Sequence, residues 1–285
     1  MAILNSAGVR PSAIAVILRA IASFGKSGIE KDLLKEIISP KNYDVQSKTE
    51  TANEIQDNLS AILYLKLAIE DNGKLALNPI FFNSPNLREY EIAKSLRRAI
   101  LSDESNDGDW KSPSYASEFT NSVAWFLTLP TSGVSTTFDS GSPNIQELQS
   151  RLFGDRVDDG WVLGNANRWN AFKHWSCSLG FAYLSAEKRI VPDPTIAIRD
   201  DIDCTFPHLT EMPATEFIKK ISENLPVLDG GKYRTLVEEH LRSVPEKRNG
   251  RIFWVEIDSA TSRSSFVAKR SATDGRPSRP DRPTS

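Results

Sequence analysis

The tightest constraint on the fold is the pair Asn72–Gly73, which lies between two short apolar runs within residues 67–77. A two-residue hairpin turn needs positive φ at both central positions, and Asn-Gly is the sequence that best accepts it. Residues 51–65 precede the hairpin and repeat apolar residues with helical spacing. Two shorter helices are expected earlier, at 11–24 and 29–38. Helices followed by a tight hairpin predict a winged helix-turn-helix.

A second stretch of the chain repeats this pattern. Helices are expected at 115–129, 144–153 and 165–180, followed by two short strands around a turn at 185–188. The last helix and the strands match those of the first stretch with an offset of 114 to 115 residues. The sequence therefore predicts a mainly α fold with small β-hairpins, built from tandem winged helix-turn-helix domains.

Helices at 214–225 and 233–244 and a β-branched, aromatic strand at 251–257 suggest a third unit, with 264–269 able to pair with that strand. From residue 271 onward the chain lacks large apolar residues, so we expect a disordered tail. The predicted domains are an N-terminal winged-helix domain with an extra helix (1–101), a second winged-helix-like domain (112–205), a C-terminal helix and hairpin module (206–270) and the tail (271–285).

The composition is that of an ordinary globular protein and excludes several classes. The formal charge is −2, so the chain as a whole is not a polycation that would bind nucleic acid by charge alone. Its two cysteines, Cys177 and Cys204, are too few for a disulfide framework or a cysteine-based zinc site. No secretory signal or membrane-spanning run is evident. We expect a soluble, cytoplasmic protein of bacterial type.

No catalytic motif stands out. Walker, dinucleotide-binding and nucleophile-elbow patterns are missing from the sequence. His174 and Cys177 are three positions apart on one predicted helix, which is poor geometry for a nucleophilic pair. The cluster Asp200, Asp201 and Asp203 could bind Mg²⁺, but a solvated loop is the expectation. We predict no enzymatic activity, no cofactor and no metal site.

Nucleic-acid contacts are the open question. In helix-turn-helix proteins the third helix enters the major groove, so Asn53, Gln56 and Asn58 are candidate base readers and Lys74 a candidate wing contact. Residues 48–65 nevertheless carry a net charge of −2, which suits phosphates poorly. The second unit has more basic residues at the corresponding places. They are Arg168, Lys173, Lys188 and Arg189.

Basic residues also gather on the expected helix at 86–101, where Arg88, Lys94, Arg97 and Arg98 make one side positive. Winged helices bind proteins as well as DNA, and the acidic first unit fits protein binding. Direct nucleic-acid contact and protein contacts alone both remain open.

The opening Met1-Ala2-Ile3-Leu4-Asn5, with Pro11-Ser12 and the helix end Leu18-Arg19-Ala20-Ile21, resembles the start of DpdG proteins. These are accessory components of bacterial gene clusters that insert 7-deazaguanine bases into DNA and restrict foreign DNA. The resemblance implies an anti-phage or DNA-modification setting and a non-enzymatic subunit beside helicases and nucleases. It implies no catalytic residues.

Three functions follow as hypotheses. The first is a non-catalytic adaptor in a DNA-modification or defence complex, whose partners are the other subunits and, as a further candidate, double-stranded DNA. The second is a sequence-specific winged-helix transcription regulator, which would be a dimer on a palindromic site. The third is an enzyme whose site is assembled from Asp200, Asp201 and Asp203.

Overall fold

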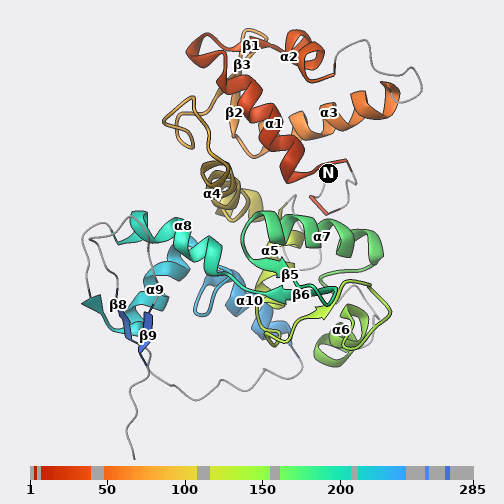
Figure 1. Cartoon of the computed structure of the whole chain (residues 1–285), viewed down its shortest axis with the longest axis vertical. Helices are drawn as coiled ribbons and strands as arrows, with labels where there is room; N and C mark the ends of the chain where they lie inside the picture. The colour runs from red at the N-terminus through yellow and green to blue at the C-terminus, as the bar shows by residue number, and fades with distance from the viewer. Residues whose placement is uncertain are drawn as a thin grey trace, which may run out of the picture.

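The described part of the chain is mainly helical, with three small antiparallel sheets of three strands each (Figure 1). The computed structural model describes residues 3–4, 8–39, 48–107, 116–154, 161–206, 211–241, 254–256 and 267–269. The mainly α class with small hairpins is confirmed. Within the described ranges no helix is long and apolar enough to cross a membrane.

The first unit contains helices α1, α2 and α3 and a sheet whose strand order is β1-β3-β2. Asn72 and Gly73 both have positive φ (49° and 77°), so the predicted hairpin is confirmed. The elements, with a short 3₁₀ helix η1, are α1 Pro11–Ala22, η1 Gly25–Ser27, β1 Ile29–Glu30, α2 Lys31–Ile38, α3 Lys48–Tyr64, β2 Ala68–Asp71 and β3 Lys74–Leu77.

The expected second helix differs from the observed one. Residues 29–30 form strand β1, and Ile29 pairs with Leu75 of β3, so α2 begins only at Lys31. Of the apolar residues of α2, Leu34 is buried, while Leu33 and Ile37 are 44% and 47% exposed. A helix of eight residues packed on one side cannot bury its whole apolar stripe.

The second unit has the same succession of elements, and its sheet has the corresponding order β4-β6-β5. Its core is aromatic: Trp169 stacks on Phe172 with ring centroids 5.5 Å apart, and Phe126 meets Phe172 edge-on. Its elements are α5 Ser117–Phe126, β4 Val134–Ser135, α6 Ile145–Phe153, α7 Ala166–Ser178, β5 Ala182–Leu184 and β6 Arg189–Pro192.

The two units agree in fine detail. The amide of Asn78 donates to the Leu67 carbonyl at 3.0 Å, and the amide of Asp193 donates to the Phe181 carbonyl at the same distance. The residue before the first strand of each sheet is a glycine with positive φ, namely Gly28 and Gly133. In both, a Cβ would lie 2.9–3.0 Å from a carbonyl oxygen of the middle strand.

Helix α4 and the short 3₁₀ helix η2 lie between the first two units, and a third set of elements follows the second unit. The third set repeats the element order of the first two units, but its sheet has the strand order β7-β8-β9. The predicted strand pair is confirmed as β8 and β9. These elements are α4 Glu89–Ile100, η2 Asp103–Asn106, α8 Thr195–Thr205, β7 Glu211–Met212, α9 Ala214–Asn224, α10 Lys232–His240, β8 Trp254–Glu256 and β9 Val267–Lys269.

Buried apolar residues from all the units form one continuous core. Helix α10 lies against α5 of the second unit, where Arg234 donates to the Ala124 carbonyl at 3.2 Å. Helix α4 connects the first unit to the second and packs against α8. The tail expected at 271–285 and residues 108–115 at the first predicted domain boundary lie outside the described residues.

Candidate nucleic-acid interface

Helix α3 presents two of its three candidate readers to solvent. Asn53 and Gln56 are exposed, whereas Asn58 is only 1% exposed. The Asn58 amide donates to the carbonyls of Gly8 and Glu54, each at 2.7 Å, and its oxygen accepts from the Arg10 amide at 3.0 Å. Asn58 is therefore not a reader: it holds the segment before α1 against α3.

The first hairpin carries both basic and acidic side chains. Lys74 is exposed at the start of β3 and pairs in the ladder with Asp71. Glu70 on the neighbouring strand forms an ion pair with Lys31 at 2.6 Å. Lys74 therefore projects from a hairpin whose nearest charges include acids, which is a weak site for a phosphate.

In the second unit, two of the predicted basic residues on α7 have partners within the unit. Arg168 forms an ion pair with Glu118 of α5 at 2.6 Å. Burial of the Glu118 carboxyl raises its pKa, and Arg168 opposes that shift. Lys173 donates to the Thr136 carbonyl, and its burial lowers the pKa of its ammonium group.

Arg189 is also engaged inside the unit. Its guanidinium donates to three backbone carbonyls of the segment before α6, those of Ser132, Gly133 and Ser142. Lys188, at the hairpin turn with φ 55°, is exposed. Of the four basic residues that the sequence points to in this unit, Lys188 is therefore the most exposed to a partner.

The structure exposes a face of α7 that was not predicted from the sequence. Asn167, Asn170 and His174 are exposed and lie at i, i+3 and i+7 on this helix. With the offset of 114 residues they correspond to Asn53, Gln56 and Ser60 of α3. The repeat itself was the signal that would have identified them.

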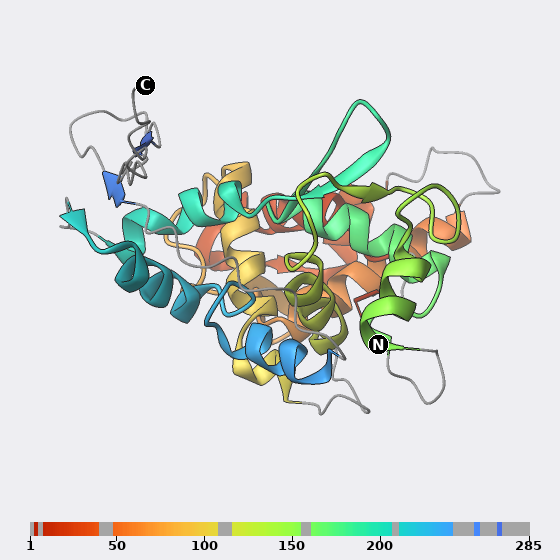
Figure 2. The same cartoon turned by 90° about the horizontal axis from the view of Figure 1, so that it is seen from below.

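The second hairpin adds apolar surface. Tyr183 and Leu184 of β5 are 48% and 57% exposed. Strand β5 lies at the edge of its sheet, so its side chains have a neighbour on one side only. Figure 2 shows the β5–β6 hairpin standing out from the body of the molecule. The protruding hairpin therefore offers apolar contact area on β5 beside the exposed Lys188 of its turn.

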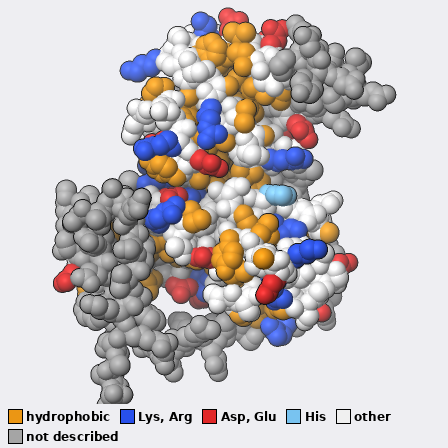
Figure 3. Space-filling view, viewed as in Figure 1, with side chains coloured by type: hydrophobic (Ala, Val, Ile, Leu, Met, Phe, Trp, Pro, Cys, Tyr) orange, Lys and Arg blue, Asp and Glu red, His pale blue; other side chains and the backbone are white. Residues whose placement is uncertain are grey.

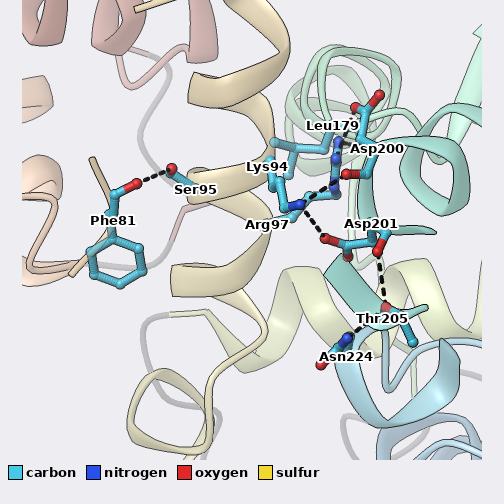
Figure 4. Close-up of polar contacts among 9 residues, drawn as sticks. All are labelled: Phe81, Lys94, Ser95, Arg97, Leu179, Asp200, Asp201, Thr205 and Asn224. Atoms are coloured by element: carbon cyan, nitrogen blue, oxygen red, sulfur yellow. Dashed lines mark hydrogen bonds and ion pairs between the residues drawn. The ribbon is translucent and has the colours of Figure 1, made fainter. Parts of the chain in front are cut away.

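The carboxylate cluster is not a solvated loop, because Asp200 and Asp201 lie on helix α8 (Figure 4). Asp200 accepts from the guanidinium of Arg97 at 2.9 Å, and the two side chains are 5% and 1% exposed. Lys94 lies 3.5 Å from Asp201, whose pKa is raised by burial. Arg97 also donates to the Leu179 carbonyl at 2.8 Å. These contacts hold α4 against α8. Lys94 and Arg97, which were expected on the basic face of α4, therefore contact acids of α8.

Comparison with known proteins places the chain in a family. A family model described as DpdG-like matches residues 1–264, which confirms the resemblance seen at the N-terminus over most of the chain. No curated protein and no solved structure matches it. The family suggests an association with DNA-modification clusters. With this match over almost its whole length, the chain belongs to the DpdG-like family.

Proposed function

We propose that this chain is a non-catalytic adaptor of a bacterial DNA-modification and anti-phage defence complex, built from tandem winged-helix units that dock other subunits. The winged-helix assignment is supported by the shared order of helix, strand, two helices and hairpin in both units. It is also supported by the strand order in which the last strand lies in the middle of each sheet.

One observation carries the preference for protein partners over base reading. Three of the four basic residues around α7 and its hairpin contact groups of their own unit: Arg168 a carboxylate, Lys173 a carbonyl and Arg189 three carbonyls. A duplex-reading helix depends on cations that are available to phosphates on either side of it. The exposed Tyr183 and Leu184 on the hairpin are residue types suited to a protein contact.

The non-catalytic part of the proposal is supported by the ion pairs that Asp200 and Asp201 form within the fold. Asp200 is held by Arg97, and Asp201 faces Lys94, so both acids already have cationic partners within the fold. Nothing further is required to explain their burial. The side chain of Asp203 is not among those described.

The experiment is affinity purification of the full chain, co-expressed with the other proteins encoded in its cluster, with and without nuclease treatment. We expect at least one subunit to remain bound after nuclease treatment. The variant Tyr183→Ser/Leu184→Ser should lose that subunit, because it removes apolar contact area without touching buried groups. Leu33→Ser/Ile37→Ser, which removes the exposed apolar pair of α2, is the matched control and should retain it. Recovery of neither a subunit nor DNA would overturn the proposal.

A transcription regulator is the second candidate, and the exposed face formed by Asn167, Asn170 and His174 is the observation that favours it. Asn side chains can read adenine in the major groove. Selection of binding sites from a pool of random duplexes would distinguish the two functions. A regulator must enrich a palindrome and bind it as a dimer, whereas an adaptor enriches no sequence.

A further inference from the structure

Helix α4 and its N-cap residue carry two exposed arginines that the proposed docking surfaces do not use. Its core positions Ile92, Leu96 and Ile100 are buried. Arg97 is also buried, on the side that meets α8. Arg88 has a side chain that is 66% exposed, and Arg98 is exposed as well.

Two further arginines extend this surface across the junction between the units. The guanidinium of Arg19 on α1 donates to the carbonyl of Leu87 at 3.4 Å, directly before Arg88. Arg199 on α8 contacts Asp200, the same carboxylate that holds Arg97, and its side chain is 51% exposed. We call Arg19, Arg88, Arg98 and Arg199 the α4 strip. Figure 3 shows several Lys and Arg side chains across the middle of this face, with acidic side chains among them.

Aromatic rings support two of these arginines. The Arg88 guanidinium lies over the ring of Tyr90 at 4.7 Å from its centroid, and that of Arg98 lies over Phe81 at 5.8 Å. A ring face restrains the planar guanidinium while leaving N–H groups directed outward. The forks of Arg88 and Arg98 are therefore partly ordered before any ligand binds, which lowers the entropy lost on binding.

The acids nearby offset only part of this charge. Asp200 is buried beneath Arg97 and Arg199. Glu91, whose side chain is 30% exposed, accepts from the Arg88 amide at 2.8 Å and forms an ion pair with the Arg88 guanidinium at 3.5 Å, so it offsets part of the charge of that arginine. Glu89 is the exposed acid of the first turn and lies about 100° around the helix from Arg88. The four arginines therefore outnumber Glu89 and Glu91 of α4, and the strip keeps a net positive charge.

We propose that the α4 strip binds the phosphate backbone of double-stranded DNA without reading its sequence. Arginine forks match phosphate oxygens in geometry as well as in charge. Arg88 and Arg98 are ten residues apart, about 15 Å along an α-helix, which corresponds to roughly four base-pair steps of a duplex. The inference deepens the proposed function and rests on it: protein subunits dock on the hairpins while DNA lies across the junction.

The test measures fluorescence anisotropy of a labelled duplex of mixed sequence, about 24 base pairs long, with the full-length chain. The variant Arg88→Gln/Arg98→Gln should weaken binding at about 50 mM salt by roughly tenfold or more and reduce the slope of log K against log salt by about 2. Lys74→Gln/Lys188→Gln removes the same charge from the two hairpins and is the matched control. It should change the affinity less than about twofold.

Arg88→Lys/Arg98→Lys keeps the charge but loses the fork and the ring contact, so its affinity should lie between those of the wild type and the glutamine variant, which separates loss of charge from loss of fold. The inference is overturned if the wild-type chain does not bind the duplex at low salt, or if the hairpin variant loses binding and the strip variant keeps it. It is also overturned if single-stranded DNA binds much more tightly than the duplex. If the strip variant loses a protein subunit after nuclease treatment, the strip is a protein contact, and the proposed adaptor function still stands.

Discussion

Removing the carboxylate of Asp200 should destabilise the protein strongly. The substitution Asp200→Ala leaves the Arg97 guanidinium, whose side chain is 1% exposed, without its anionic partner. Its remaining hydrogen bond is to the Leu179 carbonyl, and its Nε atom has no partner. Breaking a buried ion pair by removing one partner costs about 3–5 kcal/mol. This loss falls on the contact between α4 and α8.

The expected shift in melting temperature follows from the length of the chain. At roughly 2.1 cal/mol/K per residue, 285 residues give an unfolding entropy of about 0.6 kcal/mol/K. A loss of 3–5 kcal/mol therefore lowers Tm by about 5–8 °C. Urea unfolding and calorimetry of Asp200→Ala beside the wild type measure both quantities.

An exposed pair provides the control. Lys66 and Glu104 are only 2.7 Å apart, closer than Arg97 and Asp200, but their side chains are 63% and 73% exposed. Glu104→Gln should cost less than about 1 kcal/mol, because water replaces the lost partner. The double variant Arg97→Met/Asp200→Leu should regain most of the lost stability, since neither charge of this buried pair remains. Equal small losses in Asp200→Ala and Glu104→Gln would refute the reasoning.

Three further outcomes are expected. Gly133→Ala should lower the free energy of unfolding, measured in urea, by at least about 1–2 kcal/mol, because its φ is 77° and a Cβ would lie 3.0 Å from the Ile190 carbonyl oxygen. Gly73→Ala is the control and should cost less, because a Cβ at Gly73 would meet open space. Glu118→Gln should flatten the fall in stability as pH rises above 4.5, because burial raises the folded-state pKa and the folded protein then holds the proton more tightly. Asn58→Ala should cost about 1–3 kcal/mol and speed amide exchange at residues 8–10.

Each of these outcomes has a result that contradicts it. If the two glycine variants lose the same free energy of unfolding, the close approach of residue 133 to β6 does not destabilise Gly133→Ala. A wild-type chain whose stability rises between pH 4.5 and 7, with no change in slope on Glu118→Gln, would contradict the raised pKa. Amide exchange unchanged by Asn58→Ala, with Ser60→Ala as the exposed control on α3, would contradict the role given to Asn58.

Much of the fold could be predicted because it depends on short-range patterns. The Asn-Gly turn, the helical spacing of apolar residues before it and the repeat of both after about 114 residues fix most elements within a few positions. The two-residue strand β1 escaped prediction because its pairing with β3 depends on residues about 45 positions away. Helix α8 escaped because its acids look like those of a solvated loop.

The sequence alone determined most of the elements in the first two units and the pattern that they share, since turn chemistry and apolar periodicity act between near neighbours. Only the tertiary structure decided how the charges are used. Arg97 meets Asp200 across 103 residues, and Arg189 reaches carbonyls 47 to 57 residues earlier. A count of basic residues cannot tell a cation that holds the fold from one that faces a partner, because that distinction depends on which groups the folded chain brings within hydrogen-bonding distance.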